Sequence, residues 1–241
     1  MSENNFCLMP VWYPVLAEYA LPTRFMRLRK EAVEYLASDA DARKELGDSP
    51  GRAVVAELRR MMGSGWFFVS VDSCSPTDTV RFKARRGAVH SAASAWRYLC
   101  ASKKVHEAAK AGLVNYLCVR PFRTMNLPRE FRLFIKDGKL VGMSQYNLIR
   151  HFYRLDRLAK TYWEVAGKFV EAVAWKLPEK NLTIDVYITT GRQVLVVDLN
   201  PWGGGTDALL FRSWERDWTS GPQLLLMTEP RRLKGDVDVS F

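Results

Sequence analysis

Cysteine and histidine are scarce in this sequence, and those present form no recognisable pattern. The 241 residues include four cysteines and three histidines. No Cys-x-x-Cys pair occurs, and the histidines do not fall at metal-ligand spacings from the cysteines. This distribution argues against a zinc site and predicts free thiols in a reducing compartment.

Long hydrophobic runs are also missing. The uncharged stretch from 4 to 17 is too short to cross a bilayer and contains Pro10 and Pro14. The N-terminal segment carries Glu3 and has no basic stretch before an apolar run, so we expect no signal peptide. Internal repeats and low-complexity tracts are absent. Together these absences predict a cytoplasmic protein without a membrane span.

The composition is that of a globular protein with an excess of positive charge. Hydrophobic residues make up 48% of the chain and charged residues 26%, which is enough for one domain or two closely packed subdomains. Lysine and arginine outnumber the acidic residues by 36 to 26, a formal charge of +10. That excess favours nucleotides, nucleic acid or acidic protein surfaces as partners without choosing among them, and a basic surface that aids solubility explains it equally well.

The strongest local signal is a predicted β-hairpin over residues 183–200, with Thr190 and Gly191 at its turn. A symmetric turn would pair Asp185 with Val196, and Asp198 with Thr183. Side chains alternate along a strand, so such a hairpin would place two carboxylates and an amide oxygen on one face.

The acidic and amide residues on that face are Asp185, Asp198 and Asn200. Their oxygens suit a Mg²⁺ ion that also holds the phosphates of a nucleotide, whereas a polar face exposed to solvent is the alternative. The Gly-rich bend over 201–207 follows directly, and it favours a site because glycine lets backbone approach a ligand closely.

Two groups of cations lie on other predicted strands. Arg120 interrupts an apolar strand over 114–122, where it would face either a ligand or the solvent beside Pro121. Glu130, Arg132 and Lys136 alternate with apolar residues on a strand over 130–136, so both cations would face the same cleft as Asp198 and bind phosphate oxygens. A solvated hairpin face is the alternative for this second group.

The remaining pattern predicts an α+β protein. Helices are expected over 50–62, 91–111 and 156–175, and strands over 66–71, from Thr79 to Lys83, and over 140–145. We divide the chain into an N-terminal region with a first subdomain over 1–112 and a second subdomain, which carries the acidic hairpin, over 113–241.

Several of these segments resemble signatures of the cell division cycle protein 123 family. The two longest are residues 130–145 (Glu-Phe-Arg-Leu-Phe-Ile-Lys-Asp-Gly-Lys-Leu-Val-Gly-Met-Ser-Gln) and 197–203 (Val-Asp-Leu-Asn-Pro-Trp-Gly), the latter accompanied by Asp-Val-Tyr at 185–187 and Thr-Asp-Ala-Leu-Leu-Phe at 206–211. Shorter matches are Trp-Tyr-Pro at 12–14 and Ser-Pro-Thr-Asp at 75–78. The resemblance runs in order from about residue 10 to about residue 218.

The resemblance implies an ATP-grasp fold, in which two α+β subdomains hold ATP in a cleft between them. It implies nucleotide and phosphate contacts by Arg120, Arg132 and Lys136, the last two also neutralising a transferred phosphoryl group as catalytic residues. It places the backbone of Leu117, Cys118 and Val119 beside the adenine, and Mg²⁺ on Asp185, Asp198 and Asn200.

Three functions are compatible with this resemblance. The first is a Mg-ATP-dependent ligase that joins a carboxylate of a protein, peptide or small acid to an amine through an acyl phosphate. The second is an ATP-binding assembly chaperone for translation initiation factor 2, the role of eukaryotic members. The third is an ATP-dependent RNA-modifying or RNA-joining enzyme, which the basic charge permits. The acceptor or partner is not identified by the sequence.

The chain departs from the family pattern at one place. Ser70 stands where the family usually has a lysine that contacts ATP phosphate, and Thr77 stands where a basic residue is often found. A serine hydroxyl does not replace an ammonium ion. We therefore expect Lys83, helped by Arg81, to supply part of the missing charge.

Overall fold

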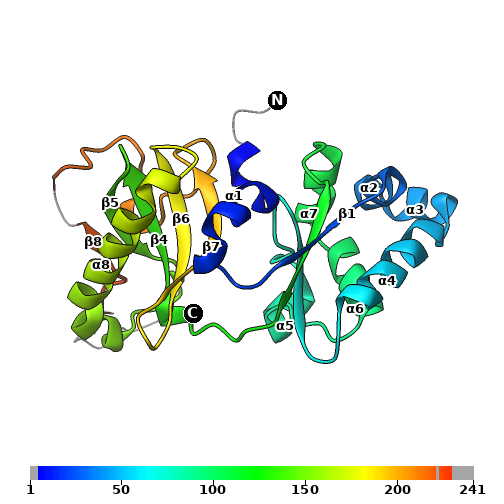
Figure 1. Ribbon diagram of the computed structural model, residues 1–241, viewed down its shortest axis with the longest axis horizontal. Helices are drawn as coiled ribbons and strands as arrows, with labels where there is room; N and C mark the ends of the chain where they lie inside the picture. Colours follow the sequence, from blue (N-terminus) through cyan, green and yellow to red (C-terminus); the bar gives the residue numbers. More distant parts are fainter. Residues whose placement is uncertain (1–4, 221–222, 230–241) are drawn as a thin grey trace, which may run out of the picture.

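The computed structural model describes residues 5–220 and 223–229, and it folds into two halves, each built on its own β-sheet (Figure 1). Across these residues, no helix is long and apolar enough to cross a membrane. The two sheets, with helices packed around each, give the α+β class that the sequence predicts.

The first half contains a three-stranded antiparallel sheet in the order β1-β3-β2. Its strands are β1 (Arg24–Arg27), β2 (Phe67–Val71) and β3 (Tyr116–Pro121). Its helices are α2 (Lys30–Ala37), α3 (Ala40–Leu46), α4 (Ser49–Met61), α5 (Val80–Arg85), α6 (Ala92–Cys100) and α7 (Lys103–Lys110). Leu36, Leu58 and Leu99 are fully buried between these helices and the sheet.

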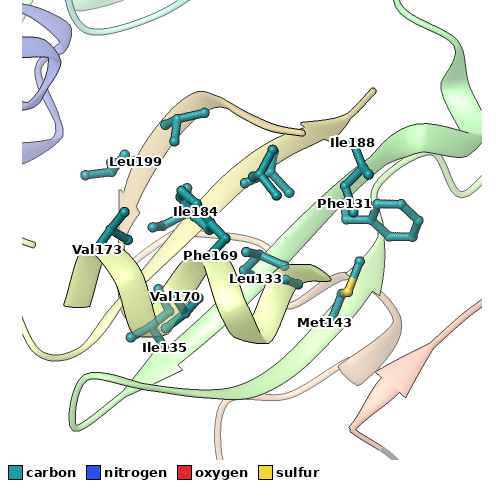
Figure 2. Close-up of a cluster of buried hydrophobic side chains, with 14 of the residues drawn as sticks. Phe131, Leu133, Ile135, Met143, Phe169, Val170, Val173, Ile184, Ile188 and Leu199 are labelled. Carbon is teal, nitrogen blue, oxygen red and sulfur yellow. The ribbon is translucent and has the colours of Figure 1, made fainter. Parts of the chain in front are cut away.

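The second half contains a five-stranded sheet in the order β7-β6-β4-β5-β8. Its strands are β4 (Glu130–Lys136), β5 (Lys139–Gln145), β6 (Leu182–Ile188), β7 (Val194–Pro201) and β8 (Leu224–Leu225). One face is covered by α8 (Tyr153–Val173), whose Phe169, Val170 and Val173 lie over Ile135 and Ile184 (Figure 2). Short 3₁₀ turns complete the chain at Asn5–Cys7, Ala17–Tyr19, Leu127–Arg129, Ala174–Lys176 and Leu209–Phe211.

The division of the chain by hydrophobic cores differs from the predicted division at residues 112 and 113. Strand β3 follows residue 113 but is the central strand of the first sheet. Helix α1 (Met9–Leu16) precedes the first sheet, yet Met9, Trp12 and Leu16 are buried in the core of the second half. Both ends of the first half therefore connect to the second, and residues 230–241 of the predicted second subdomain lie outside the described residues.

Local chemistry fixes two element boundaries that the sequence prediction misplaced. The expected strand from Thr79 to Lys83 is wrong: these residues begin α5, and the Thr79 hydroxyl caps the helix by accepting a hydrogen bond from Phe82 N at 3.2 Å. The expected helix over 91–111 is two helices, because Ser102 caps the start of α7 by accepting a bond from Val105 N at 3.2 Å.

The acidic hairpin forms, but its register differs from the predicted one. Its loop has three residues, 190–192, and Arg192 takes the left-handed conformation at φ 63°. A bulge at Val197 then shifts the pairing again, so that Asp185 lies opposite Asp198 and Thr183 opposite Asn200. The predicted pairing of Asp185 with Val196 is therefore wrong, whereas the expected common face of Asp185, Asp198 and Asn200 is confirmed.

Candidate functional site

A pocket of about 640 Å³ lies between the two sheets and is lined by residues of both halves. The first half contributes the ends of β2 and β3, the turn after β2 and part of α5. The second half contributes the start of β4, the end of β5 and the acidic hairpin. The segment that connects the halves also borders the pocket, through Phe122, Arg123 and Met125. This volume and position are typical of a small-ligand site.

Asp185 is neutralised from within the protein by Arg132. The two side chains face each other across β4 and β6 and are joined by two hydrogen bonds, Nε to Oδ1 at 2.7 Å and Nη2 to Oδ2 at 2.8 Å. Arg132 also donates from Nη1 to the Asp207 carbonyl at 2.7 Å. Burial alone would lower the pKa of Arg132, but the bonds to Asp185 outweigh it and the pKa is raised.

The Gly-rich bend over 201–207 contacts the buried Arg132–Asp185 pair and does not line the pocket. Gly203, Gly204 and Gly205 have φ values of 74°, 56° and 96°, and a Cβ on any of them would meet no atom within 4 Å. Glycine is therefore required for the backbone conformation and not for close approach to a ligand. The bend returns the chain so that the Asp207 carbonyl reaches Arg132.

Among the residues that the structure describes, no cation forms a salt bridge with Asp198. It lies beside Asp185 on the pocket face of the hairpin, partly exposed, and accepts only the backbone N–H of Leu199 at 3.1 Å. Burial, and then the neighbouring charge of Asp185, raise the pKa of Asp198 to about 7. Asn200 also faces the pocket and donates to Asp185 Oδ2 at 3.3 Å, which leaves its carbonyl oxygen uncommitted. The pocket thus presents a carboxylate that forms no salt bridge with any described cation.

Arg120 approaches the same pocket from the first sheet. Its side chain is 7% exposed, its guanidinium carbon lies 5.2 Å from the centre of the Phe68 ring, and its Nε makes no hydrogen bond with any described residue. Burial lowers the pKa of Arg120, while the charge of Asp198 opposes that shift. A buried guanidinium without a hydrogen-bonded acid is expected to have an anionic ligand as its partner.

Besides Arg123, already named as bordering the pocket, sequence reasoning missed two cations that line it, Arg86 and Lys104. Arg86 follows α5 and lies four residues after Phe82, which also faces the pocket, as expected for one side of a helical turn. Lys104 lies at the start of α7 and donates to the Thr77 hydroxyl at 3.3 Å. Only the helical assignment of 80–85 and the packing of α7 beside the turn could have identified them.

Four predicted site residues or segments do not line this pocket. Arg132 is one of them, since its guanidinium is bound to Asp185 and to the Asp207 carbonyl. Lys83 is exposed and does not line it, because helical rotation turns it away from Phe82 and Arg86. Lys136 is exposed at the far end of β4, about 13 Å along the strand from Arg132. Leu117, Cys118 and Val119 are buried in the middle of the first sheet, where β3 pairs with strands on both sides. Contrary to expectation, none of these residues lines the pocket between the sheets, whereas residues 120–123 line it.

The residues present fit a magnesium ion only in combination with a ligand. Among the described residues, no group of three histidine, cysteine or acidic side chains converges to hold a metal. Asp198 and the carbonyl of Asn200 supply oxygen ligands, and Asp185 is already balanced by Arg132. Because Mg²⁺ keeps waters or phosphate oxygens in much of its coordination shell, two or three protein oxygens suffice when a phosphate completes the site.

Comparison with known proteins agrees with the motifs. The family model described as D123 matches residues 88–220, more than half of the chain. Cell division cycle protein 123 from Candida glabrata is 37% identical over 97 residues, 39% of this chain and 27% of that protein. The translation initiation factor eIF2 assembly protein from Danio rerio is 31% identical over 113 residues, 46% of this chain and 32% of that protein. The chain spans about a quarter to a third of the length of these curated relatives.

A solved structure confirms the fold over nearly the whole chain. Cdc123 from Schizosaccharomyces pombe superposes with a TM-score of 0.77 and 18% identity, and the match covers 91% of this chain and 94% of that one. The arrangement of two α+β halves is therefore the fold of Cdc123. The chain belongs to the D123 family, that of cell division cycle protein 123.

Proposed function

We propose that this protein binds Mg-ATP in the pocket between its two sheets and uses it to assist the assembly of a protein complex. One observation carries the nucleotide part. The buried guanidinium of Arg120 and the carboxylate of Asp198 share a pocket, yet neither forms a salt bridge with any described residue. A magnesium-bound polyphosphate satisfies both, because its phosphate oxygens meet the arginine and its metal meets the carboxylate.

The positions of the other residues give each a role in this proposal. Asp198 and Asn200 hold the metal, with Asp185 kept in place by Arg132. Arg120, Arg86 and Lys104 surround the phosphates. Phe122 and Met125, in the segment that connects the halves, offer apolar contact for the base. When bound, the metal neutralises phosphate charge and orients the phosphate chain.

The assembly function is supported by the relatives and not by the geometry alone. Several relatives are named as eIF2 assembly proteins. We therefore favour a translation initiation factor 2 subunit, or a protein like it, as the partner. The sequence alone favours a carboxylate–amine ligase, whereas the relatives favour the assembly function. The ligase is now supported only by the general fold, the RNA enzyme only by the basic charge, and the cytoplasmic location remains a prediction.

Two measurements separate these functions. Titration calorimetry with ATP should show binding that requires Mg²⁺ and is lost with excess chelator. Pull-down of eIF2 subunits, with and without Mg-ATP, should then show nucleotide-dependent complex formation. Release of ADP that depends on an added amine acceptor would instead identify a ligase, and absence of Mg-ATP binding would exclude both proposals.

Replacing Arg120 with methionine should affect binding and stability in opposite directions. Loss of the guanidinium is expected to weaken Mg-ATP binding by about 1.5–3 kcal/mol, the range for hydrogen bonds to charged groups. The fold itself should be as stable or slightly more stable, because methionine fills similar space without a buried charge. Calorimetry and urea unfolding of the ligand-free protein measure the two effects. A stability loss with unchanged nucleotide affinity would show that Arg120 is structural.

Lys104, and not Lys83, is expected to replace the lysine absent at Ser70. Lys104→Ala should weaken Mg-ATP binding about tenfold, whereas Lys83→Ala, a matched change outside the pocket, should leave it unchanged. Ser70 lines the same pocket, so Ser70→Lys in the Lys104→Ala background should restore part of the affinity. Equal affinities for the Lys104→Ala and Lys83→Ala variants in calorimetry would contradict this assignment.

A further inference from the structure

Positive charge is concentrated in one segment of the first half. Residues 79–104 contain seven cationic residues and no acidic one: Arg81, Lys83, Arg85, Arg86, Arg97, Lys103 and Lys104. None of them forms a salt bridge with a described acidic residue, whereas the same half pairs Lys30 with Glu34 at 3.5 Å and Lys44 with Asp41 at 2.8 Å. The positive charge of residues 79–104 is therefore not paired with acidic side chains, as charges on α2 and α3 are.

A second pocket opens on this surface. It measures about 470 Å³, lies between α5, α6 and the start of α7, and shares no lining residue with the pocket between the sheets. We call it the α5–α6 pocket. Three cations line it, Arg81, Arg97 and Lys103, together with small or apolar side chains that include Val80 and Ala101. A cavity with cationic and apolar walls distinguishes this surface from a simple solvated basic face.

Val80 adds an apolar contact point. It is the first residue of α5, it lines the pocket, and its side chain is 83% exposed. No other large hydrophobic residue in the described part of the chain exposes a greater fraction. One aliphatic side chain beside three cations is suited to a ligand that carries both negative charge and an aliphatic group.

The acidic residue in the lining, Asp78, is already committed to the protein. Its carboxylate accepts hydrogen bonds from the Ser102 hydroxyl at 2.6 Å and from the backbone N–H groups of Lys103 and Lys104 at 2.8 and 3.3 Å. These bonds offset its charge and hold it at the start of α7. The cations of the α5–α6 pocket therefore form no salt bridge with a carboxylate of the described residues.

We propose that the α5–α6 pocket binds an acidic segment of a partner protein, with carboxylates on Arg81, Arg97 and Lys103 and one aliphatic side chain against Val80. Single-stranded RNA fits less well, because binding of bases relies on exposed aromatic faces and the ring that lines this pocket, Tyr98, is only 2% exposed. The proposal does not rest on nucleotide binding in the other pocket.

Fluorescence anisotropy can test whether the α5–α6 pocket binds an acidic segment. The probe is a labelled twelve-residue peptide that consists of Asp and Glu residues with one Leu at its centre. The double variant Arg97→Glu/Lys103→Glu should weaken peptide binding at least about tenfold. The matched double variant Arg52→Glu/Arg59→Glu changes the same net charge on exposed residues of α4, outside the pocket, and should weaken binding less than about threefold. Replacing the central Leu of the peptide with Ser should weaken its binding to the parent protein. The same replacement should not weaken its binding to the Val80→Asp variant. Circular dichroism confirms that each variant folds.

The outcomes are distinct. Selective loss in the pocket variant, together with the Leu and Val80 dependence, supports the proposal. Equal losses in both double variants would reduce the effect to general charge attraction and overturn it. Tighter binding of a twelve-nucleotide uridine RNA than of the peptide, with the same dependence on Arg97 and Lys103, would overturn it in favour of a nucleic-acid surface.

Discussion

Arg132→Ala is expected to destabilise the protein by about 3–5 kcal/mol, because it leaves the Asp185 carboxylate buried without its partner. Both side chains are buried, and two hydrogen bonds of 2.7 and 2.8 Å join them. The loss would also free the Asp207 carbonyl at the end of the Gly-rich bend. Urea unfolding of the ligand-free protein measures the difference in free energy.

Two controls isolate the role of the ion pair. Arg132→Met combined with Asp185→Asn removes both charges and should destabilise less than Arg132→Ala, since no lone charge stays buried. Arg157→Ala, an exposed arginine on α8, should change stability by less than about 0.5 kcal/mol. If Arg132→Ala proves as stable as the parent, Arg132 is not held by Asp185 and is available to a ligand, as the sequence analysis assumed.

Asp198→Asn should weaken Mg-dependent ATP binding about 100-fold or more while the protein stays folded. Asp198 is the hairpin carboxylate that forms no salt bridge with a described cation, so it is the main charge available to a metal. Calorimetry with ATP and Mg²⁺ tests this against Glu171→Ala, which removes an exposed carboxylate from α8. Unchanged affinity in the Asp198→Asn variant would remove the hairpin from the site.

The same substitution should stabilise the ligand-free protein more at high pH than at low pH. The pKa of Asp198 is raised from 3.8 to about 7 in the folded state. Between these two values, Asp198 is protonated in the folded protein and ionised in the unfolded chain. Ionised Asp198 therefore lowers stability as pH rises from about 4 to about 7, and asparagine avoids this loss. We expect the melting temperature of the variant to exceed that of the parent by a few degrees, roughly 2–5 °C, at about pH 8 and by less at about pH 5. An equal difference at both values would contradict the raised pKa.

The local pattern was sufficient where one strand or turn decides the outcome. Asp137 and Gly138 form the predicted turn between β4 and β5 with φ values of 50° and 72°, since both residues tolerate the left-handed region. The common face of Asp185, Asp198 and Asn200 was also predictable. The loop is one residue longer than predicted, and the bulge adds one more residue. Together they move the partner of Asp185 from Val196 to Asp198, an even shift that keeps the same side chains on one face.

The sequence by itself determined the α+β class, the acidic hairpin and the likeness to the D123 family, because these depend on neighbouring residues and on motif order. Only the tertiary structure decided which charges meet. It paired Arg132 with Asp185, and it placed Arg120 and Asp198 in one pocket without a salt bridge to any described residue. Lys83 and Lys136 do not line that pocket, whereas Arg86, Lys104 and Arg123 do. Charge pairing depends on distances between residues far apart in the chain, and strand or helix periodicity carries no information about those distances.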